Sequence, residues 1–254
     1  MSTGPYLSLI LPAYNEAATI RHTLHKAQSY LDRQQFLYEI LVAADGNDGT
    51  RELVTEVAAQ DCRIQVLGGP ERAGKGRGIR MAVARAVGEI IGFADADDKT
   101  PIEELEKMLP WLGQGFDVVI GSRAVSESRI EIRQPLYRRL GSMGFGMLMH
   151  MAVGLWDIHD TQCGFKFFRG QVARDLFGRQ RIDGYMFDVE VLYLARSSGY
   201  RIKEVGVCWR DDGDSRLELF AGNWRNMIDL LRICFGGRSA EKRRRSTEQQ
   251  HHAA

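Results

Sequence analysis

The sequence predicts an α/β protein in which helices flank a Rossmann-like, mostly parallel central sheet. Three observations predict this class: short apolar runs alternate with helical patterns, polar clusters directly follow the apolar runs, and 44% of the 254 residues are hydrophobic. Such alternation implies right-handed crossovers between parallel strands, whose carboxyl ends form the ligand-binding edge. The length suits one core, so we expect a single domain over residues 1–235 and a basic, disordered tail over residues 236–254.

Apolar runs and helical patterns alternate through the first half of the chain. Asn15 is predicted to cap the first helix, and Thr100-Pro101-Ile102-Glu103 to form a capping box with proline at the first helical position. The apolar positions that mark the helices are Ile20, Leu24, Ala27 and Leu31, then Leu53 and Val57, then Ile79, Val83 and Val87. The predicted strands are Leu7–Leu11, Ile40–Ala43, Ile64–Leu67, Ile90–Ala94 and Val118–Ile120.

The second half continues with a strand pair and a helix over Phe165–Phe168, Val189–Ala195 and Tyr200–Trp209. Two further segments are apolar and carry arginines: Leu136–Leu155, which is rich in methionine, and a last helix over Leu217–Phe235. Segments of this kind either pack onto a core or lie in a membrane interface.

Bulk composition excludes several classes of function. The formal net charge of +1 gives no field that would draw the chain onto nucleic acid, although Lys242–Arg245 is basic. The four cysteines form no CxxC pair, which indicates a reducing cytoplasm. Met1–Pro5 has no basic cluster typical of a signal peptide, and no apolar stretch reaches the ~20 residues needed to cross a bilayer. We therefore expect a protein that is soluble or lies on a membrane surface.

The tripeptide Asp95-Ala96-Asp97 directly follows a predicted strand. Two carboxylates at the end of a buried strand repel each other unless a cation neutralises them. Carboxylate and phosphate oxygens are the ligands that Mg²⁺ and Mn²⁺ prefer. The tripeptide therefore predicts a divalent-metal site; the alternative is that Asp97 or Asp98 merely begins a turn.

Three further polar clusters follow strand ends. Pro12–Glu16 ends the first strand and offers the Tyr14 ring to a base, and within Ala44–Thr50 the Asp45 carboxylate can accept from a nucleoside N–H or hydroxyl. Gly74–Gly78 lacks the spacing of a P-loop, but it precedes a helix whose free N–H groups favour phosphate. The plainer alternative for each cluster is a turn that leads into a helix.

In this order, the four clusters resemble family-2 glycosyltransferases, and among them the polyprenyl-phosphate group that contains dolichyl-phosphate glucosyltransferase and dolichyl-phosphate mannose synthase. The resemblance covers about residue 6 to about residue 235. Its most specific stretch, Asp160–Lys166, is more similar to the glucosyl branch, and Lys99 replaces a glutamine of the mannose synthases. The other matching segments are Leu9–Glu16, Gly74–Gly76, Asp95–Asp97, Ile120–Arg123, Phe187–Glu190 and Arg210–Arg216.

The resemblance implies a GT-A fold and inverting transfer of a hexose, glucose first and mannose next, from a UDP- or GDP-sugar to a polyprenyl phosphate. It implies that Asp95 and Asp97 hold Mg²⁺ or Mn²⁺. The donor-binding residues that it implies are Pro12, Ala13, Tyr14, Glu16, Asp45, Lys75 and Ala96. Those that it implies for the acceptor phosphate or the departing diphosphate are Arg123, Arg138, Ser142, Arg210 and Arg216.

A phosphate acceptor is already anionic near neutral pH, so positioning and cationic compensation matter more than a base. The candidate catalytic residues are Asp97, Arg123 and Asp188. Asp188 falls where relatives with hydroxyl acceptors have a base, and its alternative role is that of a helix-capping acid.

A lipid acceptor implies peripheral binding at the cytoplasmic face of a membrane, with Leu136–Leu155 and Leu217–Phe235 in the interface. Three rival hypotheses remain open at this point. They are a family-2 glycosyltransferase with a soluble hydroxyl acceptor, a non-catalytic nucleotide-sugar-binding module, and a nucleotidyltransferase. A nucleic-acid partner is not expected.

Overall fold

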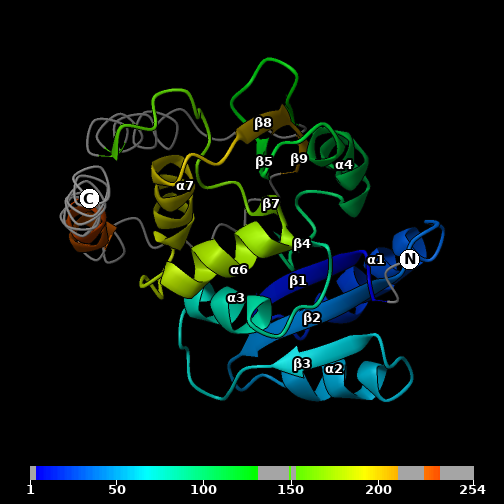
Figure 1. Cartoon of the computed structure of the whole chain (residues 1–254). Coiled ribbons are helices and arrows are strands. Elements are labelled where there is room, and N and C mark those ends of the chain that lie inside the picture. Colours follow the sequence, from blue (N-terminus) through cyan, green and yellow to red (C-terminus); the bar gives the residue numbers. More distant parts are fainter. Residues whose placement is uncertain (1–3, 131–148, 150–152, 211–225, 235–254) are drawn as a thin grey trace, which may run out of the picture.

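The computed structural model describes residues 4–130, 149, 153–210 and 226–234. In this part of the chain, a seven-stranded sheet has the order β3-β2-β1-β4-β7-β5-β8, and β6 pairs with β9 in a second, two-stranded sheet (Figure 1). The strands are β1 Leu7–Tyr14, β2 Tyr38–Asp45, β3 Ile64–Leu67, β4 Ile90–Ala94, β5 Val118–Ser122, β6 Arg129–Ile130, β7 Phe165–Arg169, β8 Ile202–Gly206 and β9 Cys208–Trp209. The helices are α1 Ile20–Leu31, α2 Thr50–Ala58, α3 Lys75–Val83, the 3₁₀ turn η1 Ile102–Glu104, α4 Leu105–Gly113, α6 Gly170–Arg179 and α7 Phe187–Ser197.

The sheet is parallel except at one strand. β1 pairs in parallel with β2 and β4, and β5 pairs in parallel with β8. β7 is inserted antiparallel between β4 and β5, with Phe165 opposite Ala94. Because β7 runs the other way, it begins at the edge where β4 and β5 end. The segment before Phe165 therefore reaches the same edge as the residues that follow Ala94.

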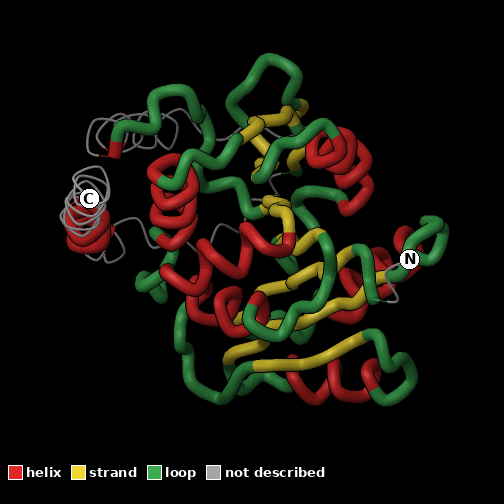
Figure 2. Tube along the Cα trace, in the orientation of Figure 1, coloured by secondary structure: helices red, strands yellow, loops and turns green. Residues whose placement is uncertain are grey.

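Alternate residues of each central strand face two different hydrophobic cores. On β1, Ile10 packs in the core with α3, α6 and α7, whereas Leu9 and Leu11 pack in the core with α1, α2 and α4. This alternation follows from the period of two in a strand, since both faces of the sheet are covered. Figure 2 shows the strands lying between the helices. The fold is the predicted mostly parallel α/β sheet with flanking helices.

Three local predictions about the helices are wrong. Asn15 does not cap the first helix, because α1 begins at Ile20 and Asn15 has a left-handed φ of 53°. Thr100 forms no capping box, since η1 begins at Ile102 without a side-chain cap. Val87 lies beyond the end of α3 and is 61% exposed. Tertiary contacts and turn geometry outweigh the local capping signal at the first two positions.

The two apolar segments predicted for the membrane interface are described only in part. Met149, Val153 and Leu155 of the first segment, and Leu230 and Ile233 of the second, are buried in the core that contains α7. For these residues the core-packing alternative is correct. Residues 226–234 are helical, and on the same helix Ile228 and Leu231 are 38% and 49% exposed. The remaining residues of both segments, and the tail over residues 236–254, lie outside the described residues.

No helix that the structure describes combines the length and the apolar character needed to span a bilayer.

Candidate active site

Contacts between loops bring the predicted polar clusters together at the carboxyl edge of the sheet. Asn15 Oδ1 accepts a hydrogen bond from Asn47 N at 3.2 Å, which joins the loops after β1 and β2. A Cβ on Gly46 would lie 2.0 Å from Asn15 Oδ1, so only glycine fits there. Asp45 Oδ2 accepts from Ala73 N at 2.9 Å, which ties the loop before α3 to the end of β2.

Asp95 is held at the end of β4 by the segment before β7. Asp95 N donates to Gly164 O at 3.1 Å, and a Cβ on Gly164 would lie 2.0 Å from Asp95 Oδ2. The glycine therefore leaves room for the carboxylate. Lys75 Nζ lies 2.5 Å from Asp95 Oδ1. Burial alone would lower the pKa of Lys75, but the carboxylates of Asp95 and Asp188 outweigh it and hold this pKa above its ordinary value.

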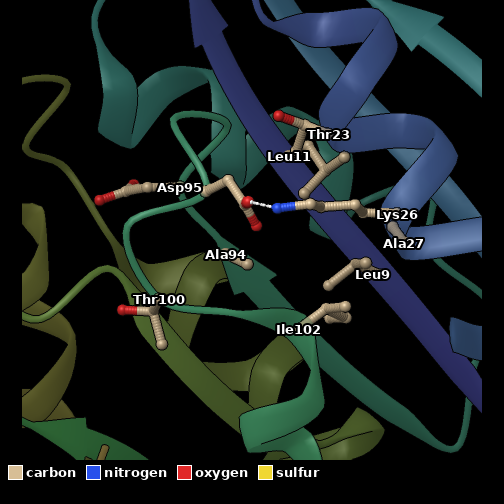
Figure 3. Close-up of a pocket in the computed structure, with 10 residues that line it drawn as sticks. Leu9, Leu11, Thr23, Lys26, Ala27, Ala94, Asp95, Thr100 and Ile102 are labelled. Carbon is tan, nitrogen blue, oxygen red and sulfur yellow. Dashed lines mark hydrogen bonds and ion pairs between the residues drawn. The ribbon is translucent and has the colours of Figure 1, made fainter. Parts of the chain in front are cut away.

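A small pocket behind this edge is lined mainly by apolar side chains, among them Leu9, Leu11 and Ile102. Figure 3 shows the Asp95 carboxylate turned away from these side chains. Lys26, which also lines the pocket, forms an ion pair with Asp98. The pocket is therefore part of the packing between α1 and the sheet, and the Asp95 carboxylate points away from its apolar lining.

Asp97 lies two residues further on, and its Oδ1 accepts from Lys99 N at 3.2 Å. Lys99 Nζ lies 3.5 Å from Asp97 Oδ2. Burial, followed by the charge of Asp95, raises the pKa of Asp97. The two aspartates therefore repel each other, and this pair of anionic oxygen donors fits a divalent cation. Within the described residues, no three His, Cys, Asp or Glu side chains form a metal-binding group.

Asp45 and Asp48 make different contacts in the loop after β2. Asp45 ends β2 and accepts from the backbone of the loop before α3. Asp48 accepts from Ala17 N and from both the backbone and the hydroxyl of Thr50, and these hydrogen bonds lower its pKa against the effect of burial. Asp48 is thus a loop-closing residue, and Asp45 remains the candidate for nucleoside binding.

The ring of Tyr14 is predicted to stack on the base of the nucleotide, and a guanidinium lies over one of its faces. The Arg72 guanidinium lies 4.4 Å from the ring centroid, and Arg72 Nη2 donates to Tyr185 Oη at 3.3 Å. Glu16 accepts at its carboxylate from the Thr19 hydroxyl at 3.0 Å. The other predicted donor-binding residues lie in β1 and after β4: Pro12 is half-buried, Ala13 is buried, and Ala96 is buried with its carbonyl accepting from the Thr23 hydroxyl.

The glycines beside Lys75 pack closely against the segment before α7, and binding of phosphate by this loop stays a prediction. A Cβ on Gly74, which has a φ of 106°, would lie 2.3 Å from Asp183 O, and a Cβ on Gly76 would lie 2.5 Å from Ile182 O. These close approaches seat the first turn of α3 against the segment before α7. Lys75 is thus the residue of this loop that faces the carboxylates, and its backbone is fixed on both sides.

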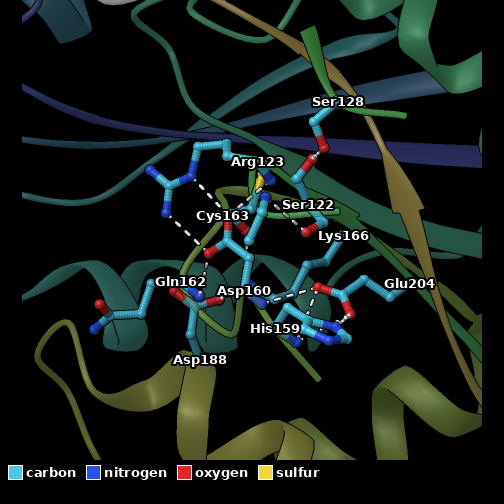
Figure 4. Close-up of polar contacts among 11 residues, drawn as sticks. Ser122, Arg123, Ser128, His159, Asp160, Gln162, Cys163, Lys166, Asp188 and Glu204 are labelled. Carbon is cyan, nitrogen blue, oxygen red and sulfur yellow. Dashed lines mark hydrogen bonds and ion pairs between the residues drawn. The ribbon is translucent and has the colours of Figure 1, made fainter. Parts of the chain in front are cut away.

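Arg123, at the end of β5, is bound by a carboxylate from the segment before β7 (Figure 4). Asp160 accepts from Arg123 N, Nε and Nη2 at 3.0, 2.7 and 2.9 Å. Although burial opposes both shifts, this pairing raises the pKa of Arg123 and lowers that of Asp160. Glu204 on β8 in turn accepts from Asp160 N at 2.8 Å and from His159 N and Nδ1. The guanidinium is therefore held in a fixed orientation, which suits recognition of an anion.

Asp188, in the first turn of α7, is paired with a buried lysine (Figure 4). Lys166 Nζ donates to Asp188 Oδ1 and to Cys163 O, both at 2.6 Å. The two side chains are 1% and 5% exposed. Burial raises the pKa of Asp188 against the opposing charges of Lys166 and Lys75. This carboxylate is therefore committed to an internal ion pair, and a role as catalytic base stays a prediction.

Of the remaining predicted residues, Arg210 is exposed and its backbone N donates to Lys99 O at 2.9 Å, which places it beside the Asp97 loop. Arg138, Ser142 and Arg216 lie outside the described residues. Sequence reasoning assigned no role to Arg72, Asp160, Gly164, Lys166 and Glu204. One signal for Lys166 was present: a lysine within the apolar run Phe165–Phe168 indicates a buried ion pair.

A mostly parallel α/β sheet with paired aspartates at a strand end agrees with the predicted GT-A fold. Residues 8–177 match the family model described as Glycosyl transferase family 2. The chain therefore belongs to glycosyltransferase family 2, and it is an enzyme that transfers a sugar.

Relatives and solved structures agree with this assignment. A dolichyl-phosphate beta-glucosyltransferase of Trichomonas vaginalis is 37% identical over 239 residues, covering 90% of this chain and 70% of that protein. The human dolichyl-phosphate beta-glucosyltransferase is 34% identical, covering 89% of this chain and 74% of that protein. Among solved structures, glucosyl-3-phosphoglycerate synthase from Mycobacterium tuberculosis, in complex with Mn²⁺, UDP and phosphoglyceric acid, matches 91% of this chain and 79% of its own with a TM-score of 0.68 at 22% identity. The likeness to this structure confirms the fold.

Proposed function

We propose that this chain is a metal-dependent, inverting hexosyltransferase that moves glucose, with mannose as the second choice, from a nucleotide-sugar to a polyprenyl phosphate of the dolichyl type. The two dolichyl-phosphate beta-glucosyltransferases, at 37% and 34% identity, support glucose and a lipid phosphate. The structural observation that carries the proposal is the pairing of Lys75 with Asp95 and of Lys99 with Asp97.

On the donor side, Asp95 and Asp97 would hold Mg²⁺ or Mn²⁺, which would neutralise the departing diphosphate. Lys75 adds a cation on the same side. Tyr14 offers a ring face to the base, and Asp45 offers a carboxylate at the neighbouring strand end. Pro12, Ala13, Glu16 and Ala96 complete the proposed donor pocket.

On the acceptor side, the phosphate is its own nucleophile because it is anionic near neutral pH. The protein must therefore position it and balance its charge against that of the donor diphosphate. Arg123, oriented by Asp160, is the described residue that suits this task. Arg138, Ser142, Arg210 and Arg216 are proposed to bind the acceptor phosphate or the diphosphate. Asp188 is not needed as a base in this scheme, which agrees with its ion pair to Lys166.

A panel of sugar nucleotides incubated with a short-chain polyprenyl phosphate tests the proposal, with nucleoside diphosphate release as the readout. UDP-glucose is expected to be turned over most rapidly, and only when the lipid phosphate is present. Equal turnover with a soluble hydroxyl acceptor would favour the rival family-2 reaction. Release of pyrophosphate would indicate a nucleotidyltransferase instead.

We also propose that the protein binds peripherally to the cytoplasmic face of a membrane, because a polyprenyl phosphate presents only its headgroup there. Exposed apolar side chains of the described part, Trp156 at 61%, Ile228 and Leu231, support a contact with lipid. The basic tail over residues 236–254 would add an attraction to anionic headgroups that salt screens. Sedimentation with anionic liposomes should show binding that weakens as salt rises. A protein that stays in the supernatant at low salt would contradict this part of the proposal.

A further inference from the structure

Each aspartate of the candidate metal site has a lysine partner from a different segment. Lys75, the first residue of α3, lies 2.5 Å from Asp95, and Lys99, in the loop before η1, lies 3.5 Å from Asp97. The lysine side chains are 18% and 15% exposed, whereas the aspartate side chains are 39% and 36% exposed. The lysines therefore approach from the protein side and leave the outer side of the carboxylates open.

The positions of both lysines are properties of the fold. Gly74 and Gly76 pack against the carbonyls of Asp183 and Ile182, which fixes the backbone on both sides of Lys75. The Lys99 backbone donates to Asp97 Oδ1 and accepts from Arg210 N. Two other cations near the site have carboxylate partners of their own, since the buried Lys166 pairs with Asp188 and the half-buried Arg123 with Asp160.

The two carboxylates and the two ammonium groups together carry no formal net charge. A divalent cation alone then has to displace the ammonium groups, and within the described residues no group of three side-chain ligands compensates for that cost. A bound diphosphate changes this balance, because its negative charges attract both the metal and the two lysines. Metal and nucleotide binding should therefore strengthen each other.

We propose that Lys75 and Lys99 are built-in counter-ions of Asp95 and Asp97, which keep the affinity for a divalent cation low until a nucleoside diphosphate binds and takes the ammonium groups over. This inference rests on the proposed function in that the anion is a nucleoside diphosphate. It adds that the metal binds tightly only when the diphosphate is bound, and it assigns Lys99 a role in donor binding.

Titration with Mn²⁺ alone tests the inference, with free Mn²⁺ measured by electron paramagnetic resonance, before and after addition of UDP. For the unchanged protein, UDP should tighten Mn²⁺ binding roughly 5–150-fold, the usual range of coupling between two sites. Lys75→Met should bind Mn²⁺ alone about tenfold more tightly, because one ammonium no longer competes. The factor by which UDP tightens Mn²⁺ binding should then be smaller in this variant than in the unchanged protein. Lys99→Met should shift both quantities in the same direction by a smaller factor, since its ion pair is longer.

Two controls separate charge from packing. Lys75→Arg keeps the cation and should keep Mn²⁺ binding weak. Lys107→Met, which removes a half-exposed lysine paired with Glu104, should change neither quantity. If Mn²⁺ alone binds Lys75→Met and Lys99→Met no more tightly than the unchanged protein, the inference is wrong.

Because these titrations contain no sugar and no acceptor, they are independent of the transfer reaction. A protein that shows the coupling but transfers no sugar would contradict the proposed function alone. Transfer of sugar with unchanged Mn²⁺ affinity in both variants would contradict the inference alone.

Discussion

Arg123 and Asp160 lie on different segments 37 residues apart, yet three N–H donors of Arg123 converge on the one carboxylate of Asp160. The Asp160 side chain is 8% exposed and the Arg123 side chain 32% exposed. A bidentate pair of this kind restricts the rotation of the guanidinium more than a single contact would. The part of Arg123 that is exposed is thus presented to solvent in one orientation.

Asp160→Asn should weaken acceptor binding without weakening donor binding. Asparagine cannot accept at both side-chain positions, so Arg123 loses its fixed orientation. We expect the apparent KM for polyprenyl phosphate to rise about tenfold, with the KM for the sugar nucleotide nearly unchanged. Asp157→Asn, which breaks an ion pair with the exposed Arg196, is the matched control and should leave both constants unchanged. Equal changes in the two constants would instead indicate general damage to the fold.

The Arg123–Asp160 ion pair should make the free energy of unfolding depend on pH in the acid range. The pKa of Asp160 in the folded protein lies below its ordinary value of 3.8, so its stabilising contribution is complete above 3.8 and is lost as pH falls through the lower, folded value. Asp160→Asn should therefore be less stable than the unchanged protein at pH 7, and this difference should shrink below pH 3.8. Urea unfolding of both proteins at several pH values measures it. A difference that grows toward acid pH would contradict the assigned shift.

Gly164→Ala should damage the site by displacing Asp95. The added Cβ would lie 2.0 Å from Asp95 Oδ2 and cannot be accommodated without moving the carboxylate. We expect a loss of turnover of about a hundredfold, in the range seen when a group that stabilises transition-state charge is lost. Gly178→Ala is the matched control, since a Cβ on this α6 glycine meets nothing within 4 Å. It should retain activity and gain up to about 1 kcal/mol of stability. Full activity in Gly164→Ala would show that Asp95 need not hold its position.

Asp188→Asn distinguishes a structural carboxylate from a catalytic base. Removing its charge leaves the Lys166 ammonium buried without compensation, which should cost about 3–5 kcal/mol in the free energy of unfolding. Replacing both partners, with Lys166→Met and Asp188→Leu, should restore most of that loss. Urea unfolding measures both effects. An Asp188→Asn protein that is as stable as the original and yet inactive would favour the base, and with it a hydroxyl acceptor.

Local patterns in the sequence located most of the strands but not β6 or the contacts at the strand ends. β3 and β4 have the predicted bounds. Every residue of β4 is buried, and strands buried on both faces read as continuous apolar runs. The antiparallel insertion of β7 was not predicted, since strand direction is decided by long-range pairing rather than by local pattern. For the same reason, local patterns do not identify Asp160 as the partner of Arg123 or Asp188 as the partner of Lys166. The Asn15 cap failed because its side chain bonds to the neighbouring loop instead.

Transfer of labelled glucose from UDP-glucose to a short-chain polyprenyl phosphate, measured as label extracted with the lipid, tests the central claim most directly. With Mg²⁺ or Mn²⁺ present, the unchanged protein should form glucosylated lipid phosphate and release UDP in equal amounts. Excess EDTA should stop the reaction, and so should Asp97→Asn, which removes a charge from the metal site without changing side-chain size. Labelled lipid that forms at the same rate in EDTA or in Asp97→Asn, or no labelled lipid under any of these conditions, would contradict the account.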